Sequence, residues 1–253
     1  MRIFHRIALL LLLSIAFFSC GSRKKIVYLQ GIENAKSYDS STDYEAIIQP
    51  DDVLSIIVSS DSPEIAAPFN LPEIQSNEAD YRGLKTYLVD NTGYIDFPVL
   101  GKIKLGGLTR TEANNKMVTA ISEYIRKPIV NLRIANFKVS VIGEVTKPGS
   151  YNVVGERVTI LEALAMAGDL TIYGVRENVL VIRDKEGKKT YTRVDLTKPD
   201  LLNSPFYYLS QNDVVFVEQN KTRINNSVLG QDMYVLFSSL SLLVTLAVVL
   251  FKN

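Results

Sequence analysis

The stretch VDNTGYIDFPVLGKIKLGGLTRTEA, residues 89–113, decides the fold of the first half of this chain. Its residues Asp90–Gly93 are typical of a turn, because Asp, Asn and Gly tolerate the backbone angles that turns need. Apolar side chains precede this turn over Thr86–Val89 and alternate with polar ones over Tyr94–Val99, as in half-buried strands. We therefore expect a β-hairpin made of these two strands.

A helix is expected after this hairpin and the glycine-punctuated loop that follows it. Thr109 and Glu112 have the spacing of a capping box, in which each side chain bonds the backbone N–H of the other residue. Pro128 is expected to end the helix, and a strand is expected over 129–134. The residues that recur at helical spacing and are expected to face a core are Ala113, Met117, Ile121 and Tyr124.

The chain before this region starts with an apolar run, 44–48, and a turn, Pro50–Asp52. The next residues, 53–58, are β-branched and apolar enough for a buried strand. Residues 61–81 carry three prolines and many polar side chains, so we expect a surface insertion there.

The second half of the chain repeats the plan of the first. A turn is expected at Lys147–Gly149, a second capping box at Thr159 and Glu162, and a helix end at Gly168. Each half is large enough for a modest core, so the expected fold class is α+β, with units of β-grasp or ferredoxin-like character. The strands expected in this half are 138–142, 151–154, 179–183, 190–194 and 213–217.

The N-terminus has the pattern of a secretory signal over 1–19. Two arginines precede an apolar region, Ile7–Phe18, of the usual length. Cys20 follows a small residue, as in a bacterial lipobox, so we expect cleavage before Cys20 and lipid attachment to it. An uncleaved N-terminal anchor and an ordinary signal cut near Cys20 are the alternatives. Residues 20–43 are polar and mixed, which is typical of an exposed tether.

The run YVLFSSLSLLVTLAVVLF, 234–251, carries no charged residue. A helix of that length extends about 27 Å, close to the roughly 30 Å hydrocarbon core of a bilayer. We therefore expect a linker over 221–233 and a single transmembrane helix over 234–251. One narrow stripe of this helix is hydroxylated and is either pore-lining or a surface for close helix packing. The stripe consists of Tyr234, Ser238, Ser241 and Thr245.

Composition excludes several kinds of chemistry. The 253-residue chain has 28 basic and 27 acidic residues, and loss of Arg2 and Arg6 with the signal leaves 26 against 27. This balance gives no sign of a nucleic-acid partner. The single histidine, His5, lies in the signal, and the single cysteine is Cys20. We therefore expect no histidine-based triad, no metal site and no cofactor in the mature protein, whereas carboxylate chemistry stays open.

Five segments carry a family resemblance when they are taken in order. They are QPDDVLSIIV (49–58), residues 89–113, KPIVNLRI (127–134), VSVIGEVTKPGSYNV (139–153) and TILEALAMAGDLT (159–171). Together they resemble the outer-membrane polysaccharide export proteins of the Wza type. The resemblance implies a polysaccharide export domain over 44–135 and one soluble-ligand-binding β-grasp (SLBB) domain over 136–220.

The resemblance also singles out turn residues. Asp51 stands where the family usually has Gly, and Asp tolerates the left-handed φ that such a turn needs. The positions that match the family's turn motifs are Pro50, Asp52, Gly93, Pro98, Gly101, Gly107, Gly143, Pro148, Gly149 and Gly168.

A conduit is the function that this resemblance implies. Family members form homo-oligomeric rings that conduct capsular or extracellular polysaccharide across the outer membrane without catalysis, through an α-barrel of C-terminal helices. The implied partners are further copies of the chain, the polysaccharide cargo, the lipid membrane, and an inner-membrane polysaccharide co-polymerase or tyrosine kinase. That last contact is expected at loops 90–92 or 102–106. The implied location is the outer membrane, with lipid-anchored periplasmic domains and residues 252–253 outside the cell.

Two other functions stay open. One is a membrane-tethered periplasmic carbohydrate-binding lipoprotein that forms no pore, and ring formation separates it from the conduit. The other is a carboxylate-based glycan hydrolase, which needs two acids about 5–10 Å apart across a cleft. No acidic pair in the sequence stands out for that role.

Overall fold

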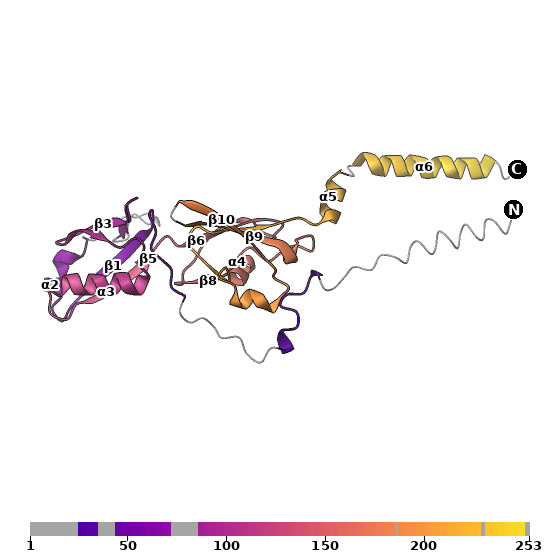
Figure 1. Ribbon diagram of the computed structural model, residues 1–253. Coiled ribbons are helices and arrows are strands. Elements are labelled where there is room, and N and C mark those ends of the chain that lie inside the picture. The colour runs from indigo at the N-terminus through magenta and orange to yellow at the C-terminus, as the bar shows by residue number, and fades with distance from the viewer. Residues whose placement is uncertain (1–24, 35–43, 72–85, 186, 229–230, 251–253) are drawn as a thin grey trace.

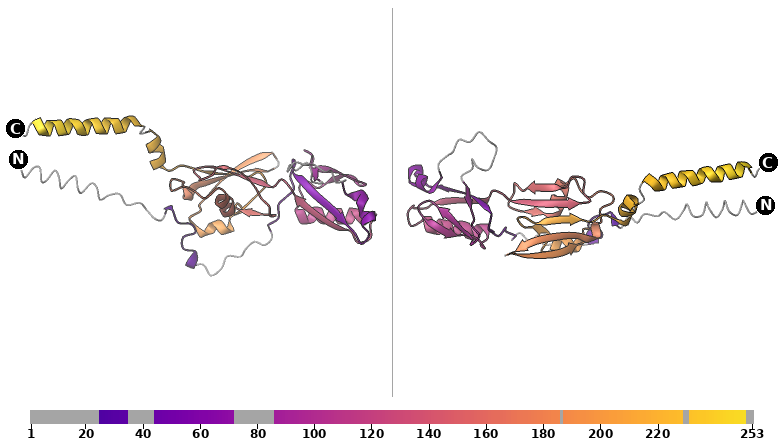
Figure 2. Two further views of the ribbon diagram at one scale, coloured as in Figure 1. Left: turned by 180° about the vertical axis from the view of Figure 1, so that it is seen from behind. Right: turned by 90° about the horizontal axis from the view of Figure 1, so that it is seen from above.

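The computed structural model describes residues 25–34, 44–71, 86–185, 187–228 and 231–250. Two domains lie next to each other, and the chain passes from the first to the second near residue 136 (Figure 1). The last helix, α6 (Gln231–Leu250), extends from the second domain on the side away from the first (Figures 1 and 2).

The centre of the first domain is a three-stranded antiparallel sheet. Its middle strand, β1 (Val53–Ser59), pairs with β2 (Thr86–Leu88) on one side and with β5 (Ile129–Ile134) on the other. Side chains alternate between the two faces of a strand, and one face of β1 lies in the core. The buried side chains of β1 are Leu54, Ile56 and Val58.

The predicted hairpin is wrong in its strand pairing. The turn at Asp90–Gly93 forms, but β2 pairs with β1 and not with β3 (Tyr94–Phe97). β3 pairs instead with β4 (Gly101–Lys104), a strand that the sequence pattern does not predict. The reason lies at Gly93, whose carbonyl accepts two N–H groups from the residues just after β4. These bonds hold β4, rather than β2, beside β3.

The helix α3 (Arg110–Ile121) begins as predicted. Thr109 and Glu112 each accept the backbone N–H of the other, so the capping box is confirmed. Tyr124 is 56% exposed, contrary to expectation, because the helix ends well before Pro128 and a tighter turn follows it. The buried residues of this region are Ala113, Met117, Ile121 and Ile125.

The expected surface insertion contributes to the core of the first domain. α2 (Pro63–Ala66) and η3 (Ala67–Phe69) bring the apolar side chains of Ala66 and Phe69 inside. The Asn70 amide accepts the Val58 N–H at 3.0 Å and donates to the Val58 carbonyl at 2.9 Å. These bonds fix the insertion to β1. Residues 72–81 lie outside the described part of the chain.

The second domain contains a five-stranded sheet in the order β10-β9-β12-β6-β7. β6 and β12 are parallel, and the other neighbours are antiparallel. A parallel pair needs a long connection between its strands, and here that connection contains the remaining elements of the domain. The strands are β6 (Lys138–Gly143), β7 (Gly149–Asn152), β9 (Val179–Lys185), β10 (Lys188–Val194) and β12 (Val214–Val217).

A helix and a small second sheet complete this domain. α4 (Ile160–Met166) starts at the capping box of Thr159 and Glu162, which confirms the second predicted cap. Gly168 follows the helix with φ +72°, as expected for a helix end. The remaining elements are β8 (Val158–Thr159), which pairs with β11 (Tyr208–Leu209), and the short helices η5 (Arg176–Asn178) and η6 (Pro199–Asn203).

Gly143, at the end of β6, has no room for a side chain. Its φ is +94°, and a Cβ there would lie 2.0 Å from the carbonyl oxygen of Val217 on β12. Gly187, in the turn between β9 and β10, also has a positive φ, +74°, but nothing lies within 4 Å of its Cβ position. A positive φ costs other residues roughly 1–2 kcal/mol. At Gly143 a steric clash adds to that cost.

Part of the segment expected to be an exposed tether is docked on the second domain. The N–H groups of Leu29 and Gln30 donate to the carbonyls of residues 196 and 197, at 3.1 and 2.7 Å. η2 (Ile32–Asn34) follows these residues. The docking differs from the solvated linker expected over 20–43, because Leu29 packs against the apolar core of the second domain.

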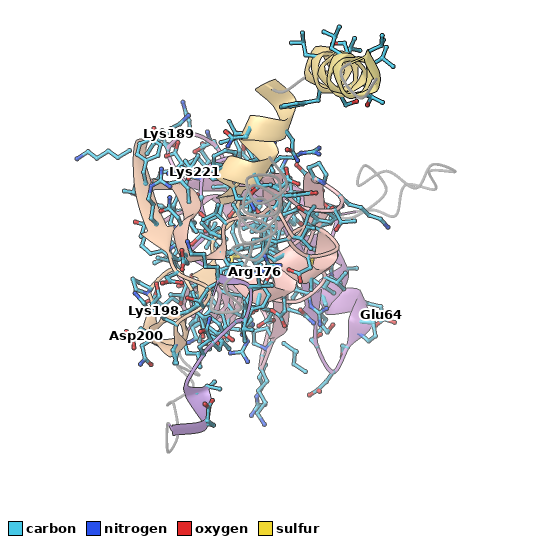
Figure 3. All side chains as sticks on the ribbon, turned by 90° about the vertical axis from the view of Figure 1, so that its right-hand side faces the viewer. Glu64, Arg176, Lys189, Lys198, Asp200 and Lys221 are labelled. Carbon is cyan, nitrogen blue, oxygen red and sulfur yellow. The ribbon has the colours of Figure 1, made fainter. Side chains whose placement is uncertain are left out.

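Tyr28 holds the same segment through its side chain. Its hydroxyl donates to the carboxylate of Asp169, and its ring centroid lies 5.3 Å from the guanidinium carbon of Arg176. Arg176 is only 5% exposed and lies near the middle of this end of the molecule, whereas Lys189 and Lys198 lie at the rim (Figure 3). Burial is the main cause that raises the pKa of Tyr28, so its hydroxyl stays a hydrogen-bond donor.

Two helices follow β12, namely α5 (Lys221–Val228) and α6. The large apolar side chains that α6 exposes are Val235, Leu236, Phe237, Leu242, Leu243 and Leu246. Within the described residues, no helix reaches the length and apolarity that crossing a membrane requires. This finding does not support the span expected over 234–251. Cys20, the expected lipid-attachment residue, lies outside the described ranges.

Candidate functional site

The two domains meet at a polar junction built around Asn136. Its Oδ1 accepts the Val53 N–H at 2.9 Å, and its Nδ2 donates to the Asp51 carbonyl at 3.1 Å. From the second domain, Gln211 donates to the Asn136 carbonyl at 2.9 Å and accepts the Lys138 N–H at 2.8 Å. The start of β1 is thereby fixed to the turn before β12.

Asp52 is a fully buried carboxyl at this junction. Its Oδ2 accepts the Gln49 N–H at 2.8 Å, whereas its Oδ1 has no hydrogen-bond partner among the described residues. Burial raises the pKa of Asp52 to about 6, although the Gln49 N–H and the Gln211 side chain act in the opposite direction. The preceding Asp51 has φ +69°, the left-handed conformation expected there.

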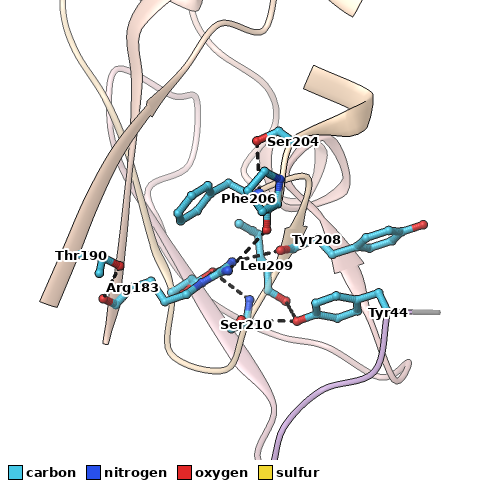
Figure 4. Close-up of polar contacts among 10 residues, drawn as sticks. Tyr44, Arg183, Thr190, Ser204, Phe206, Tyr208, Leu209 and Ser210 are labelled. Carbon is cyan, nitrogen blue, oxygen red and sulfur yellow. Dashed lines mark hydrogen bonds and ion pairs between the residues drawn. The ribbon is translucent and has the colours of Figure 1, made fainter. Parts of the chain in front are cut away.

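Arg183 and Asp213 form an ion pair beside the junction. Nη2 of Arg183 lies 2.7 Å from Oδ2 of Asp213, and Nε lies 3.0 and 3.1 Å from the two carboxylate oxygens. The guanidinium also donates to the Tyr208 carbonyl at 3.0 Å and lies 4.7 Å from the Phe206 ring centroid (Figure 4). Asp213 is fully buried, and burial raises its pKa although Arg183 favours the anion. The pair ties β9 to the start of β12.

The segment around Tyr44 contacts both domains. The Tyr44 hydroxyl donates to the Leu209 carbonyl at 2.9 Å, and its ring stacks on Tyr208 with the centroids 4.9 Å apart (Figure 4). Glu45 accepts the N–H and the hydroxyl of Thr111, at 3.0 and 2.7 Å, and these bonds lower the pKa of Glu45. Two consecutive residues thus bind the second domain and the start of α3.

Two clefts open along the junction, and residues 44–46 line both. The first, which we call the arginine cleft, has a volume of about 530 Å³. Arg110 and Glu156 form an ion pair across it, with Nε and Oε2 3.2 Å apart. The charged residues that line it are Glu45, Arg110, Arg133, Glu156 and Arg157.

The second, which we call the glycine cleft, has a volume of about 910 Å³. Gly93, Gly106 and Gly107 line it, and its side chains include Lys104 and Arg183. The cleft is a broad groove of mixed lining, because Tyr44, Ala46, Ile47, Ile48 and Pro50 also line it. Within the described ranges, no group of three His, Cys, Asp or Glu side chains is placed to hold a metal ion.

The turn residues that match family motifs do not form one site. Pro50 and Asp52 lie at the junction, and Gly93 and Gly107 line the glycine cleft. The others lie in turns or at strand ends. In the first domain, Pro98 lies in the turn after β3 and Gly101 is the first residue of β4. In the second domain, Gly143 ends β6, Pro148 and Gly149 lie at the start of β7, and Gly168 follows α4.

The hydroxylated stripe lies on α6, far from the junction (Figure 1). Ser238 donates to the Val235 carbonyl at 2.9 Å, Ser241 to the Ser238 carbonyl at 2.9 Å, and Thr245 to the Ser241 carbonyl at 2.8 Å. The three hydroxyl donors thus have partners inside their own helix. Tyr234 belongs to the same helix.

Neither the Arg183–Asp213 pair nor the Asn136–Gln211 contact was predicted. The partners are 30 and 75 residues apart in the sequence. The only local signal is the polar run Gln211–Asp213 before an apolar strand, which indicates a turn but not what the turn binds.

Comparison with known proteins assigns both domains. Residues 40–135 match the family described as "Polysaccharide biosynthesis/export protein", and residues 138–193 match the SLBB domain. The chain is 33% identical over 129 residues to the "EPS I polysaccharide export outer membrane protein EpsA" of Ralstonia solanacearum, covering 48% of this chain and 34% of the relative. It is 31% identical over 183 residues to the protein of that name from Ralstonia nicotianae, covering 67% of this chain and 46% of the relative.

These alignments span less than half the length of the two curated relatives. The two domain matches meet where the structure places the junction, since the first ends at 135 and the second begins at 138. The chain therefore belongs to the polysaccharide export family of the Wza type, with its export domain followed by an SLBB domain.

Proposed function

We propose that this protein is a subunit of an outer-membrane conduit that exports capsular or extracellular polysaccharide and performs no catalysis. The observation that carries the proposal is the match of both domains, in order, to relatives named as polysaccharide export outer membrane proteins. The bonded junction around Asn136 supports it, because a conduit wall has to keep its shape while a polymer passes.

The proposal includes two membrane attachments, a lipid on Cys20 and a span over 234–251. The span rests on the uncharged sequence run and on the apolar side chains that α6 exposes. An apolar surface of this extent is unfavourable in water and marks a site of contact with protein or membrane. Lipid, together with neighbouring copies of the helix, would bury it. The internal bonds of Ser238, Ser241 and Thr245 are compatible with lipid, with close helix packing and with a pore lining.

The proposal also includes assembly. Further copies of the chain form a ring, and an inner-membrane polysaccharide co-polymerase or tyrosine kinase delivers the polymer. The contact with that partner uses loop 90–92 or segment 102–106, which was expected to be a loop and consists of the end of β4 and the residues after it. Lys102 and Lys104 are exposed on β4, so photo-crosslinkers placed there report the partner directly. Capture of self-contacts alone during active polymer synthesis argues against this contact.

Export is tested by deleting the gene and restoring it in the source bacterium. Deletion should remove polymer from the cell surface and the medium while polymer accumulates inside the envelope, and the wild-type gene should reverse this. A Cys20→Ser variant should lose labelling by a fatty-acid analogue and export less polymer. Normal surface polymer in the deletion strain contradicts the proposed function.

Topology is tested with single cysteines in a Cys20-intact background. Cysteines at Ser238, Ser241 and Thr245 should react with a membrane-impermeant thiol reagent, whereas cysteines at Leu236 and Leu243 should not. Equal reactivity on both faces contradicts a pore lining. An epitope tag after residue 253 should be detected on intact cells, and detection only after permeabilisation contradicts the span.

A second candidate function is a membrane-tethered carbohydrate-binding lipoprotein that forms no pore. The arginine cleft favours this alternative, because a charged pocket with an aromatic wall is a place for a sugar to bind without transport. Electron microscopy of the detergent-extracted protein separates the two functions. Rings with a central opening support the conduit, and monomers support the lipoprotein.

A further inference from the structure

The arginine cleft brings together guanidinium groups from three separate elements. Arg110 is the first residue of α3, Arg133 lies on β5, and Arg157 lies in the loop before β8. The first two belong to the export domain and the third to the SLBB domain. The cleft therefore exists only because the junction holds the two domains together.

Both glutamates that line the cleft have bonding partners, whereas two of its three arginines have no carboxylate partner among the described residues. Glu45 is held by Thr111, and Glu156 is held by Arg110. Arg133 and Arg157 have no carboxylate within ion-pair distance among the described residues, and both are exposed at the surface of the cleft. Three arginines against two glutamates leave an excess of positive charge at this place.

An aromatic ring positions Arg157. The guanidinium carbon of Arg157 lies 5.3 Å from the ring centroid of Tyr208, on which Tyr44 stacks. Phe137 supplies a buried apolar wall. Ligand pockets commonly combine apolar walls with a few fixed polar groups in roughly 300–1,000 Å³, and the 530 Å³ of this cleft lies within that range.

We propose that the arginine cleft binds a carboxylate-bearing sugar unit, such as a uronic acid, in the polymer that passes this protein. The planar fork of Arg133 or Arg157 fits a carboxylate with two parallel hydrogen bonds. The ring of the sugar then lies against Tyr44 and Phe137, and the open side of the cleft lets the rest of the chain continue. This inference rests on the proposed function, because it specifies the cargo as an acidic glycan.

The test measures binding by the detergent-purified full chain with calorimetry. The probes are a trisaccharide of galacturonic acid and a neutral trisaccharide of galactose with the same linkage. The acidic probe should bind at least about tenfold more tightly than the neutral one, as charge-assisted hydrogen bonds predict. This preference should fall as salt is raised, because the contact is ionic and open to solvent.

Substitutions locate the site. Arg133→Gln and Arg157→Gln should each weaken binding of the acidic trisaccharide about tenfold, and the double variant should lose the preference for it. Arg157→Lys keeps the charge but not the fork, so it should lose part of the affinity. Arg193→Gln is the matched control, since Arg193 is exposed and pairs with Glu218 outside the cleft. The control should bind as the wild type does.

Several results overturn the inference. They are equal binding of the acidic and neutral probes, unchanged binding by the double variant, or binding of a glutamate-rich peptide as tight as that of the acidic sugar. The last result assigns the cleft to a protein partner instead. Failure here is distinguishable from failure of the proposed function, because the gene deletion tests export without any sugar-binding measurement.

Discussion

The Asp52→Asn variant is expected to gain stability over the wild type as the pH rises from acid to neutral. The quantity compared is the free energy of unfolding of the variant minus that of the wild type. The pKa of the buried carboxyl is about 6, against 3.8 for a free Asp side chain. The folded protein therefore holds this proton more tightly than the unfolded chain does. The stability that this group contributes is fully present below about pH 4 and is lost as the pH rises through 6.

The magnitude follows from the difference of about two pKa units. At about 1.4 kcal/mol for each unit, the ionised carboxyl costs about 3 kcal/mol at neutral pH. Between about pH 4 and pH 7.5, linkage gives a change of about 2.5 kcal/mol from this one group. Asn cannot ionise, and its amide oxygen can still accept the Gln49 N–H that Asp52 accepts at 2.8 Å. The variant therefore does not lose the free energy of unfolding that the wild type loses when the Asp52 carboxyl ionises.

The assay is urea unfolding of the full chain in detergent, followed by far-ultraviolet circular dichroism at several pH values. The quantity of interest is the free energy of unfolding of Asp52→Asn minus that of the wild type, because the other acidic groups cancel in this difference. It should rise by about 2.5 kcal/mol from pH 4 to pH 7.5. Asp61→Asn, an exposed control, should show no such rise. A flat difference for Asp52→Asn refutes the argument that Asp52 is buried with an unpaired oxygen.

Other substitutions test the packing around the junction and the second domain. Gly143→Ala should destabilise the protein by about 3 kcal/mol or more in urea unfolding, and Gly187→Ala by only about 1–2 kcal/mol, because only the first adds a clash to the positive φ. Equal losses for the two variants contradict the clash. Arg183→Met should cost about 3–5 kcal/mol at neutral pH, because it leaves the buried Asp213 carboxylate unpaired. A loss below about 1 kcal/mol means that solvent reaches the carboxylate. Thr159→Ala should cost about 1 kcal/mol through the lost helix cap, measured as a lower midpoint of thermal unfolding.

The sequence predicted those features of the fold that depend on residues a few positions apart. Both capping boxes form at Thr109 and Thr159, since their partners lie three residues away. Asp51 takes the left-handed φ expected of it. These features need no knowledge of the rest of the chain.

The features that the sequence did not predict depend on residues far apart. β3 pairs with β4 because Gly93 binds the backbone after β4, and a periodic pattern alone does not choose between two neighbouring strands. The junction depends on Asn136 and Gln211, which are 75 residues apart. The arginine cleft has no signature at all, because its arginines come from three elements of unrelated sequence.

The docking of Tyr28 sets how far the folded part can stand from a lipid on Cys20. A free chain from Cys20 to Tyr44 could extend roughly 80 Å, whereas the eight residues from Cys20 to Tyr28 extend at most roughly 28 Å. The proposed anchor would then connect the lipid to the SLBB domain through a short segment. Residues 28–44 would add nothing to the distance between the lipid and the docked Tyr28. On the anchoring that we propose, the bilayer would lie within that reach of the end where Tyr28 binds, and the export domain would be the part of the molecule farther from it.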